Sequence, residues 1–215
     1  MQINQVVETY DQAAVDYEAT LSRYWDIGRD SLIASLQLKP GQTVLDAAVG
    51  TGLSLPAYPE GVSVVGVDLS HKMMDEARKK RVSADITFKI SDICNLDFPD
   101  NSFDAAASGY TLCVLNDPVR ALEEIIRVTK PGALIAILDY PKSQDPETQK
   151  WQELIADAAS QLGFPTGKIK WNALMDYDKL IYNSNLPIEV LVDDRTESPN
   201  PFLCSCQLLL KNSKG

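Results

Sequence analysis

Two acids and a glycine-bearing loop form the pattern in this sequence that is best suited to chemistry. Residues 44–52 read Val-Leu-Asp-Ala-Ala-Val-Gly-Thr-Gly, so an apolar run ends on Asp46 and leads into Gly50 and Gly52. Glycine has no Cβ, so the backbone at these two positions can approach a ligand closely. A second acid, Asp68, closes the next apolar run, 22 residues after Asp46. A carboxylate at that place can accept hydrogen bonds from both hydroxyls of an adenosine ribose.

The loop fits one kind of nucleotide better than another. A dinucleotide-binding fingerprint requires Gly-x-Gly-x-x-Gly, but the sixth residue counted from Gly50 is Leu55, and a pattern begun two residues earlier starts on Ala48. Asp46 would also repel a pyrophosphate, since both are negatively charged. The same acid attracts a cation. S-adenosylmethionine carries a sulfonium, an ammonium and a ribose diol but no phosphate, so we expect it as the ligand, and a nicotinamide oxidoreductase is disfavoured.

The elements around this loop predict an α/β fold. Short apolar runs bounded by Gly, Pro, Asp or Asn are typical of buried parallel strands, and they cover 43–46, 62–67, 86–90, 103–107 and 133–138. Helical patterns lie at 4–20, 21–38, 70–81, 118–129 and 146–162. Two last strands, 188–193 and 202–210, are joined too closely for a crossover helix and should pair antiparallel at the sheet edge. We therefore expect a Rossmann-like, doubly wound sheet of seven strands, mostly parallel with the last strand antiparallel.

Composition and charge exclude several classes of function. The chain has 215 residues, 45% of them hydrophobic, which is typical of one globular domain. Its net charge of −10 is spread evenly, so nucleic acid is not an expected partner. The single histidine, His71, excludes most zinc sites and facial-triad iron sites, and we expect no metal.

The four cysteines and the N-terminus bear on the compartment. No Cys-x-x-Cys pair occurs, so the cysteines are interpreted as reduced thiols. We expect the acidic N-terminus to be neither a signal nor a transit peptide, and no apolar run approaches the ~18 residues of a membrane helix. We expect a cytoplasmic protein without stable membrane insertion, and we leave its oligomeric state open.

Five motifs in the right order resemble those of class I S-adenosylmethionine-dependent methyltransferases. The similarity covers roughly residues 40–140. The segments that carry it are 44–52 and Val-Val-Gly-Val-Asp-Leu-Ser at 64–70 for the first two motifs, Ile90-Ser91-Asp92-Ile93 for the third strand, Phe103-Asp104 with Ser108-Gly109-Tyr110 for the fourth, and Arg-Val-Thr-Lys-Pro-Gly at 127–132 for the turn before the fifth.

The resemblance implies the roles of the cofactor-binding residues. Asp46 and the backbone of 48–50 would hold the methionine part, and Asp68 would hold the ribose. The adenine would be held by Asp92 and Ile93, with Leu69 packed on the ring. The full set that we predict to bind the cofactor is Tyr17, Asp46, Ala48, Gly50, Gly52, Asp68, Leu69, Asp92, Ile93 and Ser108.

Ala48 departs from the family pattern, because it stands where the first glycine is usual. Alanine tolerates ordinary strand and turn angles, but a positive φ strains it. Asp46 and Asp68 are both intact, so we expect the cofactor to bind. The alternative is a degenerate, non-binding version of the fold.

The resemblance also implies a helical lid that precedes the sheet. Within a single domain, we assign 1–39 to this lid, 40–163 to the cofactor-binding core, 164–187 to a substrate-shaping insert and 188–215 to the antiparallel edge strands. Tyr17 or Tyr10 in the lid could bind the methionine carboxylate, although aromatic residues at helical spacing also pack in cores.

The sequence assigns no catalytic residue. His71 is expected in the first turn of the helix after the second strand, away from the transferred methyl. Methyl transfer can rely on positioning and exclusion of water, or on an acid or tyrosine as base. Asp139 and Tyr140, which end the fifth predicted strand, are the best-placed candidates to contact a substrate. An aromatic set (Tyr110, Tyr140, Trp171, Tyr177 and Tyr182) would favour a cationic amine if it lined the pocket rather than the core.

The sequence thus predicts an enzyme that transfers a methyl group from S-adenosylmethionine to a small-molecule acceptor and leaves S-adenosylhomocysteine. Residues 50–56 are similar to soluble bacterial phosphatidylethanolamine N-methyltransferases, and the other related branch acts in quinone biosynthesis. Against a lipid acceptor, the N-terminal helices are acidic, whereas anionic bilayers attract basic helices. A protein that binds S-adenosylmethionine without turnover is the alternative from another class.

Overall fold

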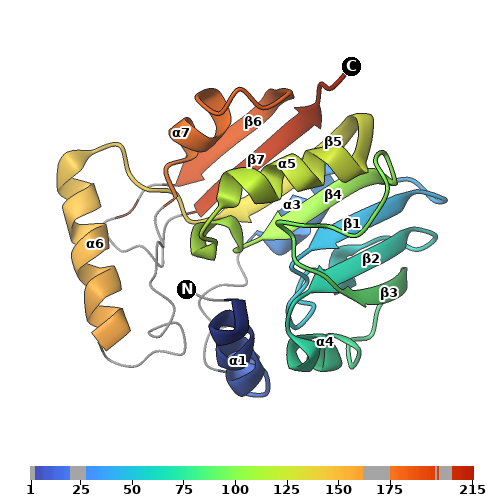
Figure 1. Ribbon diagram of the computed structural model, residues 1–215, viewed down its shortest axis with the longest axis horizontal. Coiled ribbons are helices and arrows are strands. Elements are labelled where there is room, and N and C mark those ends of the chain that lie inside the picture. Colours follow the sequence, from blue (N-terminus) through green and yellow to red (C-terminus); the bar gives the residue numbers. More distant parts are fainter. Residues whose placement is uncertain (1–2, 20–27, 162–174, 197, 199–204) are drawn as a thin grey trace.

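The computed structural model describes residues 3–19, 28–161, 175–196, 198 and 205–215. Its strands form one seven-stranded sheet in the order β3-β2-β1-β4-β5-β7-β6 (Figure 1). β1 to β5 pair in parallel, and β7 runs antiparallel to both β5 and β6, so the predicted fold is confirmed. The strands are β1 Thr43–Ala47, β2 Ser63–Asp68, β3 Asp85–Ile90, β4 Phe103–Gly109, β5 Thr129–Asp139, β6 Ile188–Thr196 and β7 Ser205–Asn212.

The central strands are buried on both faces. Alternate side chains of a strand point to opposite sides of the sheet, and an apolar cluster covers each side. In β1, Leu45 packs into one apolar cluster and Val44 into the other, and Ala106 and Ala105 of β4 divide in the same way. Helices α5 (Pro118–Val128) and α7 (Tyr177–Tyr182) contribute to the first cluster. Helices α3 (Arg29–Ser35) and α4 (His71–Ala77) contribute to the second. The apolar runs of the sequence are thus the middle layer of a three-layer fold.

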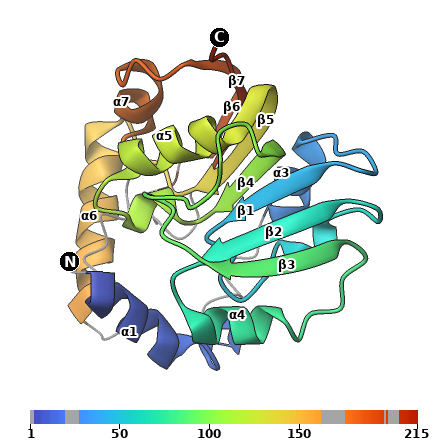
Figure 2. The same ribbon diagram turned by 45° about the vertical axis from the view of Figure 1, so that its right-hand side comes forward.

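Two further helices lie beyond the carboxyl ends of the parallel strands. These are α1 (Ile3–Ala13) and α6 (Pro146–Gln161), and Figure 2 shows α1 beside α4. α1 is shorter than the helix predicted over 4–20. Of the helix predicted over 21–38, the structure describes α3 and the residues next to it, since 20–27 lie outside the described residues.

Residue types explain where several helices begin. The Ser70 side chain accepts a hydrogen bond from the backbone N–H of Met73, which caps the first turn of α4. Asp117 caps α5 through the N–H of Arg120, and Pro118 follows at the first helical position. α4 ends at Ala77, earlier than the predicted residue 81. α7 was not predicted from the sequence, and it lies within the predicted insert 164–187.

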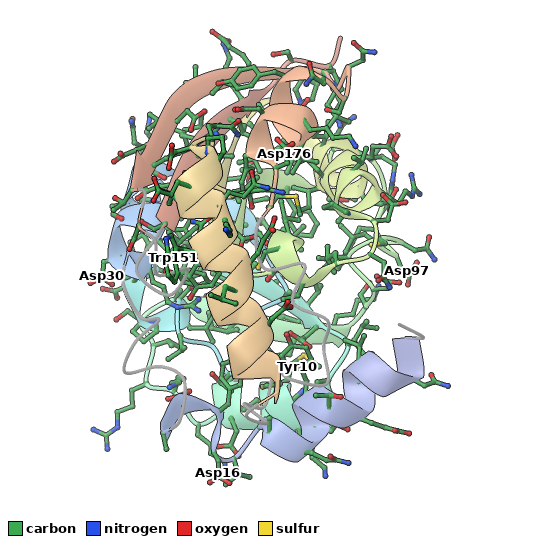
Figure 3. The ribbon with its side chains drawn as sticks, turned by 90° about the vertical axis from the view of Figure 1, so that its left-hand side faces the viewer. Tyr10, Asp16, Asp30, Asp97, Trp151 and Asp176 are labelled. Atoms are coloured by element: carbon green, nitrogen blue, oxygen red, sulfur yellow. The ribbon has the colours of Figure 1, made fainter. Side chains whose placement is uncertain are left out.

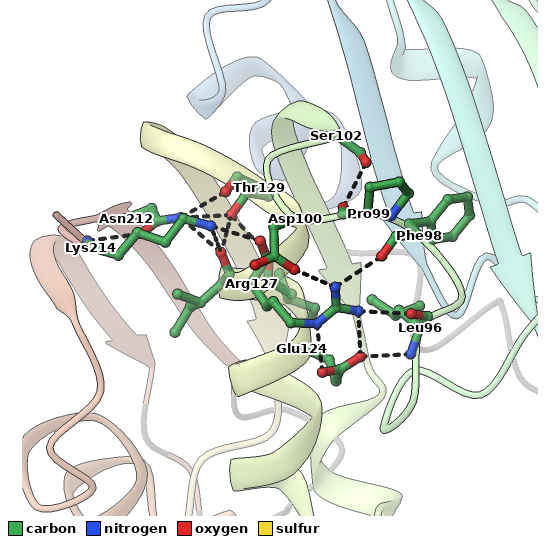
Figure 4. A network of polar contacts seen from close by, with 12 residues as sticks. Leu96, Phe98, Pro99, Asp100, Ser102, Glu124, Arg127, Thr129, Asn212 and Lys214 are labelled. Atoms are coloured by element: carbon green, nitrogen blue, oxygen red, sulfur yellow. Dashed lines mark hydrogen bonds and ion pairs between the residues drawn. The ribbon is translucent and has the colours of Figure 1, made fainter.

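Arg127, from the last of the five motifs, connects α5 to the loop between β3 and β4 (Figure 4). Its guanidinium donates to the carbonyls of Leu96 at 2.8 Å and Phe98 at 2.9 Å. It also pairs at 2.8 Å with Glu124, whose side chain is 3% exposed. Glu124 accepts in turn from the Leu96 N–H at 2.8 Å, and the hydrogen bond from Arg127 lowers the pKa of its carboxyl. This motif therefore anchors a loop rather than facing the site.

Asp104 of the Phe-Asp motif is also structural. Its carboxylate accepts from the Thr43 N–H at 2.8 Å and pairs with Lys130 at 2.6 Å. These contacts join the starts of β1, β4 and β5. They therefore lie at the amino ends of these strands, away from their carboxyl ends.

Candidate active site

A cavity lies at the carboxyl ends of the strands, where the strand order reverses between β1 and β4. In open α/β sheets this switch point is the usual place for a ligand. Four loops that follow strands supply most of the wall, and the N-terminal segment supplies the rest. The lining residues are Val6, Val7, Tyr10, Tyr17, Arg29, 48–51, Leu53, 68–70, Met73, 91–93, 109–111, Val114 and Leu115.

Seven of the ten predicted cofactor-binding residues lie on this wall. They are Tyr17, Ala48, Gly50, Asp68, Leu69, Asp92 and Ile93. Asp46, Gly52 and Ser108 do not line the cavity. Each lies within two positions in the sequence of a residue that does. The proximity of these residues follows from the fold, whereas their binding roles stay predictions.

Asp68 ends β2 on the cavity wall, and two backbone N–H groups fix its carboxylate. The Gly50 N–H donates to Oδ2 at 2.9 Å, and the Ser70 N–H donates to Oδ1 at 2.9 Å. Burial raises the pKa of this carboxyl, while the hydrogen bonds act in the opposite direction. Because each carboxylate oxygen offers about two acceptor sites, both oxygens can still accept from a ligand hydroxyl. The arrangement suits a vicinal diol.

Asp92 follows β3 and forms the wall with Ile93, which is buried. The Cys94 N–H donates to Oδ1 of Asp92 at 2.9 Å, so this side chain too is oriented by the backbone. The two acids of the wall therefore sit after adjacent strands, β2 and β3.

Asp46 lies behind the glycine loop, with 3% of its surface exposed. The Tyr58 hydroxyl donates to its Oδ2 at 3.1 Å. Burial raises the pKa of Asp46 to about 6, and the hydrogen bond from Tyr58 and the charge of Arg29 oppose that rise. Asp46 is therefore a buried neighbour of the cavity and not part of its wall.

Every second residue from 48 to 52 in the glycine loop has a positive φ. Ala48 has φ 63°, Gly50 55° and Gly52 78°. Alanine at a left-handed φ is strained, so the position where the family has glycine does need that freedom. At Gly52 an added Cβ would lie 2.7 Å from Cδ1 of Leu55 and 2.9 Å from Cβ of Ala77. Gly52 therefore shapes the loop from behind the wall.

Arg29 is a wall residue that the sequence analysis missed. Its Nη1 donates to the Ser54 hydroxyl at 3.0 Å, and its guanidinium carbon lies 5.2 Å from the centroid of the Tyr110 ring. Among the described residues that line the cavity, it is the one with a cationic side chain. An added Cβ at Gly109 would lie 3.0 Å from Nη1, so glycine at the end of β4 leaves room for the guanidinium. No motif spacing marks Arg29, so only the three-dimensional structure could find it.

The N-terminal segment closes one side of the cavity. Val6, Val7 and Tyr10 of α1 share one face of the helix, since residues three and four apart are neighbours. The ring centroid of Tyr17 lies 6.4 Å from that of Tyr10, which is labelled in Figure 3. Burial raises the pKa of both phenols above the usual value, so they are neutral at physiological pH and are poor bases.

The expectation that Asp139 and Tyr140 contact a substrate is wrong for the cavity described here. Asp139 is 0% exposed and accepts from the Cys113 N–H at 3.0 Å, the Tyr140 N–H at 2.9 Å and the Tyr177 hydroxyl at 2.9 Å. Burial raises the pKa of its carboxyl. Tyr140 is also buried, and the centroid of its ring lies 4.7 Å from that of Tyr110. Neither Asp139 nor Tyr140 lines the cavity.

The predicted aromatic set divides between wall, core and surface. Tyr110 lines the cavity, Tyr177 packs in the core, and Tyr182 is exposed with its hydroxyl 3.1 Å from Asp193. Trp171 lies outside the described residues. His71 is the exposed first residue of α4 and does not line the cavity.

The described residues contain no group of three or more His, Cys, Asp or Glu that could hold a metal ion. None of the helices within them is both long and apolar enough to cross a membrane.

The chain resembles known methyltransferases in sequence. Residues 45–137 match a family model described as a methyltransferase domain. The chain is 35% identical over 162 residues to a demethylmenaquinone methyltransferase of Paenarthrobacter aurescens, covering 72% of this chain and 61% of the relative. It is 31% identical over 144 residues to a phosphatidylethanolamine N-methyltransferase of Cereibacter sphaeroides, covering 65% and 70%.

Solved structures share the fold at low sequence identity. A magnesium protoporphyrin IX methyltransferase from Synechocystis, with bound S-adenosylhomocysteine, has a TM-score of 0.63 at 19% identity and covers 87% of this chain and 83% of its own. A 4+2 cyclase has a TM-score of 0.77 at 17% identity, with coverage of 100% and 98%. These likenesses show the fold alone, and the cyclase illustrates that one fold can serve different reactions.

The chain therefore belongs to the class I S-adenosylmethionine-dependent methyltransferases, as the motifs predicted. The match spans 61% of the length of the Paenarthrobacter relative and 59% of a demethylmenaquinone methyltransferase from Renibacterium salmoninarum.

Proposed function

We propose that this chain transfers a methyl group from S-adenosylmethionine to a small, uncharged aromatic acceptor. The observation that carries the proposal is the distribution of charge on the cavity wall. Asp68 ends β2, Asp92 follows β3, and Arg29 lies beside Gly109 at the end of β4. Between them the described wall carries apolar and phenolic side chains together with the hydroxyls of Thr51, Ser70, Ser91 and Thr111. A ligand with a polar nucleoside at one end, a carboxylate at the other and a cationic centre between them matches this pattern.

The residues present fit that cofactor. Asp68 offers both carboxylate oxygens to a ribose diol, and Asp92 offers an acceptor to the adenine amino group. Arg29 can pair with the methionine carboxylate through a charge-assisted hydrogen bond. Thr51 lies on the wall at 2% exposure, and its hydroxyl has no hydrogen-bond partner among the described residues. A buried hydroxyl of this kind favours a polar ligand group beside the glycine loop.

When bound, S-adenosylmethionine supplies a methyl group that its sulfonium activates. The protein's part is to orient the two reactants and to exclude water, which can account for much of the acceleration of a displacement. Val6, Val7 and Tyr10 cover the cavity and serve that exclusion. The negative charge of Asp46 behind the loop attracts the cationic part of the ligand.

The two carboxylates of the described wall, Asp68 and Asp92, are assigned to the nucleoside of the cofactor and so do not serve as the general base. Tyr10 and Tyr17 keep their protons because burial raises the pKa of each phenol, and Asp139 lies away from the cavity. An acceptor that reacts well here is therefore electron-rich or acidic enough to lose its proton to solvent. Hydroquinones and phenols have this property. The proposal also agrees with the name of the demethylmenaquinone relative.

Binding and turnover test the proposal separately. Calorimetric titration with S-adenosylhomocysteine should show 1:1 binding to the wild type, and Asp68→Ala should weaken it by about 10-fold or more. Absence of binding to the wild type would refute the proposed cofactor.

For the acceptor, methyl-labelled S-adenosylmethionine is incubated with hydroquinones, with phenols, and with phosphatidylethanolamine vesicles. Label should enter the aromatic acceptors. Label found only in the phospholipid would overturn the acceptor class and leave methyl transfer intact.

A further inference from the structure

Asp11 in α1 makes contacts that neither the motifs nor the proposed cofactor residues account for. The Ser70 hydroxyl donates to its Oδ1 at 2.5 Å, and the Lys72 N–H donates to the same oxygen at 3.4 Å. Asp11 thus binds the start of α4 from a helix 59 residues earlier in the chain. Figure 2 shows α1 beside α4, which lies below β3.

Ser70 is shared between α1 and the candidate ribose acid. Its backbone N–H donates to Oδ1 of Asp68 at 2.9 Å, and its hydroxyl donates to Asp11. The same hydroxyl oxygen accepts from the Met73 N–H at 3.1 Å, which caps α4. Ser70 is 2% exposed, so these bonds compete little with water. A continuous series of hydrogen bonds therefore runs from Asp11 through Ser70 to Asp68.

The face of α1 that carries Asp11 is also the face that covers the cavity. Val7 lies four residues before Asp11, and helical residues at that spacing are neighbours. Val7 and Tyr10 both line the cavity. The contact between Asp11 and Ser70 therefore links the placement of Val7 and Tyr10 at the cavity to the placement of Ser70, which donates to Asp68.

We propose that Asp11 is a positioning residue that couples the docking of α1 over the cavity to the orientation of Asp68. Asp11 touches neither cofactor nor acceptor and acts through Ser70. When the contact is made, Asp68 presents both oxygens to a diol while α1 covers the bound ligand. Because such coupling is reciprocal, a ligand that binds Asp68 also stabilises α1 in its docked position. This inference rests on the proposed function, since it assumes that Asp68 binds a ribose.

The main test is the affinity of the full chain for S-adenosylhomocysteine, measured by calorimetry. Asp11→Ala removes the acceptor oxygen and should weaken binding about 10-fold, within the range usual for coupled sites. Asp11→Asn keeps an oxygen that can accept from the Ser70 hydroxyl, so it should recover most of the affinity. A thermal unfolding midpoint of Asp11→Ala close to that of the wild type shows that the effect does not come from unfolding.

Glu18→Gln is the matched control. Glu18 also links the N-terminal segment to the region after α4, through an ion pair with Lys80 at 2.7 Å. Its removal should change the affinity by less than about twofold, as for most surface pairs. A loss as large as that of Asp11→Ala would mean that any loosening of α1 weakens binding, which overturns the specific role of Asp11.

A second ligand separates positioning from simple docking. The 2′-deoxyadenosine analogue of S-adenosylhomocysteine lacks one of the two hydroxyls offered to Asp68, so the penalty of Asp11→Ala should fall to about 3-fold or less with it. An unchanged penalty would contradict action through Asp68. If the wild type binds S-adenosylhomocysteine and Asp11→Ala binds it equally well, this inference fails and the proposed function stands. If the wild type binds neither ligand, the proposed function itself fails.

Discussion

The hydroxyl of Tyr58 donates a 3.1 Å hydrogen bond to the carboxylate of Asp46, beneath the glycine loop and out of contact with the cavity. Both side chains are buried, at 1% and 3% exposure. A negative charge at this depth is costly unless something compensates it, and one phenol hydrogen bond compensates only part. Asp46 is therefore better suited to a state in which a cation occupies the cavity.

This relationship predicts that Asp46→Asn stabilises the empty protein at neutral pH. Burial raises the folded-state pKa of Asp46 to about 6, so the folded state holds this proton longer than the unfolded chain does. Stability is therefore lost as pH rises from about 4 to about 6, by about 3 kcal/mol for a shift of about two units. Asparagine has no charge to bury, and its amide oxygen can still accept from Tyr58.

Urea unfolding of wild type and Asp46→Asn at several pH values measures this effect. The variant should be more stable at pH 7, and its advantage should vanish near pH 4. Asp68 and Asp139 also have raised pKa values, so the difference between the two proteins, not the wild-type profile, reports on Asp46. Equal stability at pH 7 would contradict the prediction. The same variant should bind S-adenosylmethionine more weakly, since the attracting charge is gone.

The glycine loop predicts an order of stability among three substitutions. Ala48→Gly relieves a strain of about 1–2 kcal/mol in the folded state but makes the unfolded chain more flexible. The free energy of unfolding should therefore stay the same or rise by up to about 1 kcal/mol. Gly50→Ala introduces strain without a clash, because an added Cβ there has nothing within 4 Å. Gly52→Ala adds clashes with Leu55 and Ala77 to the strain, so it should destabilise most.

Thermal unfolding distinguishes these outcomes, since 1 kcal/mol shifts the Tm of a chain of this size by about 2–4 °C. Ala48→Gly should leave the Tm unchanged or raise it. A fall in Tm for Ala48→Gly larger than that for Gly50→Ala would show that the alanine methyl makes packing contacts that outweigh the strain.

The position of Arg29 on the cavity wall predicts that its substitution weakens the binding of some ligands and not of others. Arg29→Gln should weaken the binding of S-adenosylhomocysteine by about 10- to 100-fold, because a charge-assisted hydrogen bond contributes about 1.5–3 kcal/mol. 5′-Methylthioadenosine has the same nucleoside but no amino-acid group, so the same variant should bind it like the wild type. Parallel titrations with the two ligands provide the comparison. Equal losses for both would place Arg29 in the structure of the cavity rather than at the carboxylate.

The sequence was informative where local pattern determines structure. Apolar runs that end in Asp46 and Asp68 located two strands and the loop after each, because a buried strand and its polar end are both visible along the chain. α7 was missed, although Asp176 before Tyr177, Leu180 and Ile181 gives a cap followed by apolar residues at helical spacing. A helix of six residues depends on burial in the core more than on its own propensity, which makes it hard to predict.

Contacts between distant segments could not be predicted. Arg29 lines the cavity because α3 packs behind β4 and Gly109 has no side chain to block it. Asp139 ends its strand as Asp68 does, so their sequence patterns are equivalent. Only the packing of Tyr177 and Cys113 around Asp139 makes one a buried structural acid and the other a wall residue.

That distinction gives the last prediction. Tyr177→Phe removes the hydroxyl that donates to Asp139 and leaves the ring in the core. The buried carboxylate then keeps its two backbone donors and loses one hydrogen bond, which should destabilise the fold by about 1–3 kcal/mol. Affinity for S-adenosylhomocysteine should stay within about twofold of the wild type, since neither residue lines the cavity.

Tyr182→Phe is the matched control, because its hydroxyl contacts Asp193 at an exposed site. Urea unfolding and calorimetry on both variants measure the two quantities. If Tyr177→Phe keeps full stability but loses methyl transfer, Asp139 belongs to the chemistry after all, since a purely structural acid would change stability first.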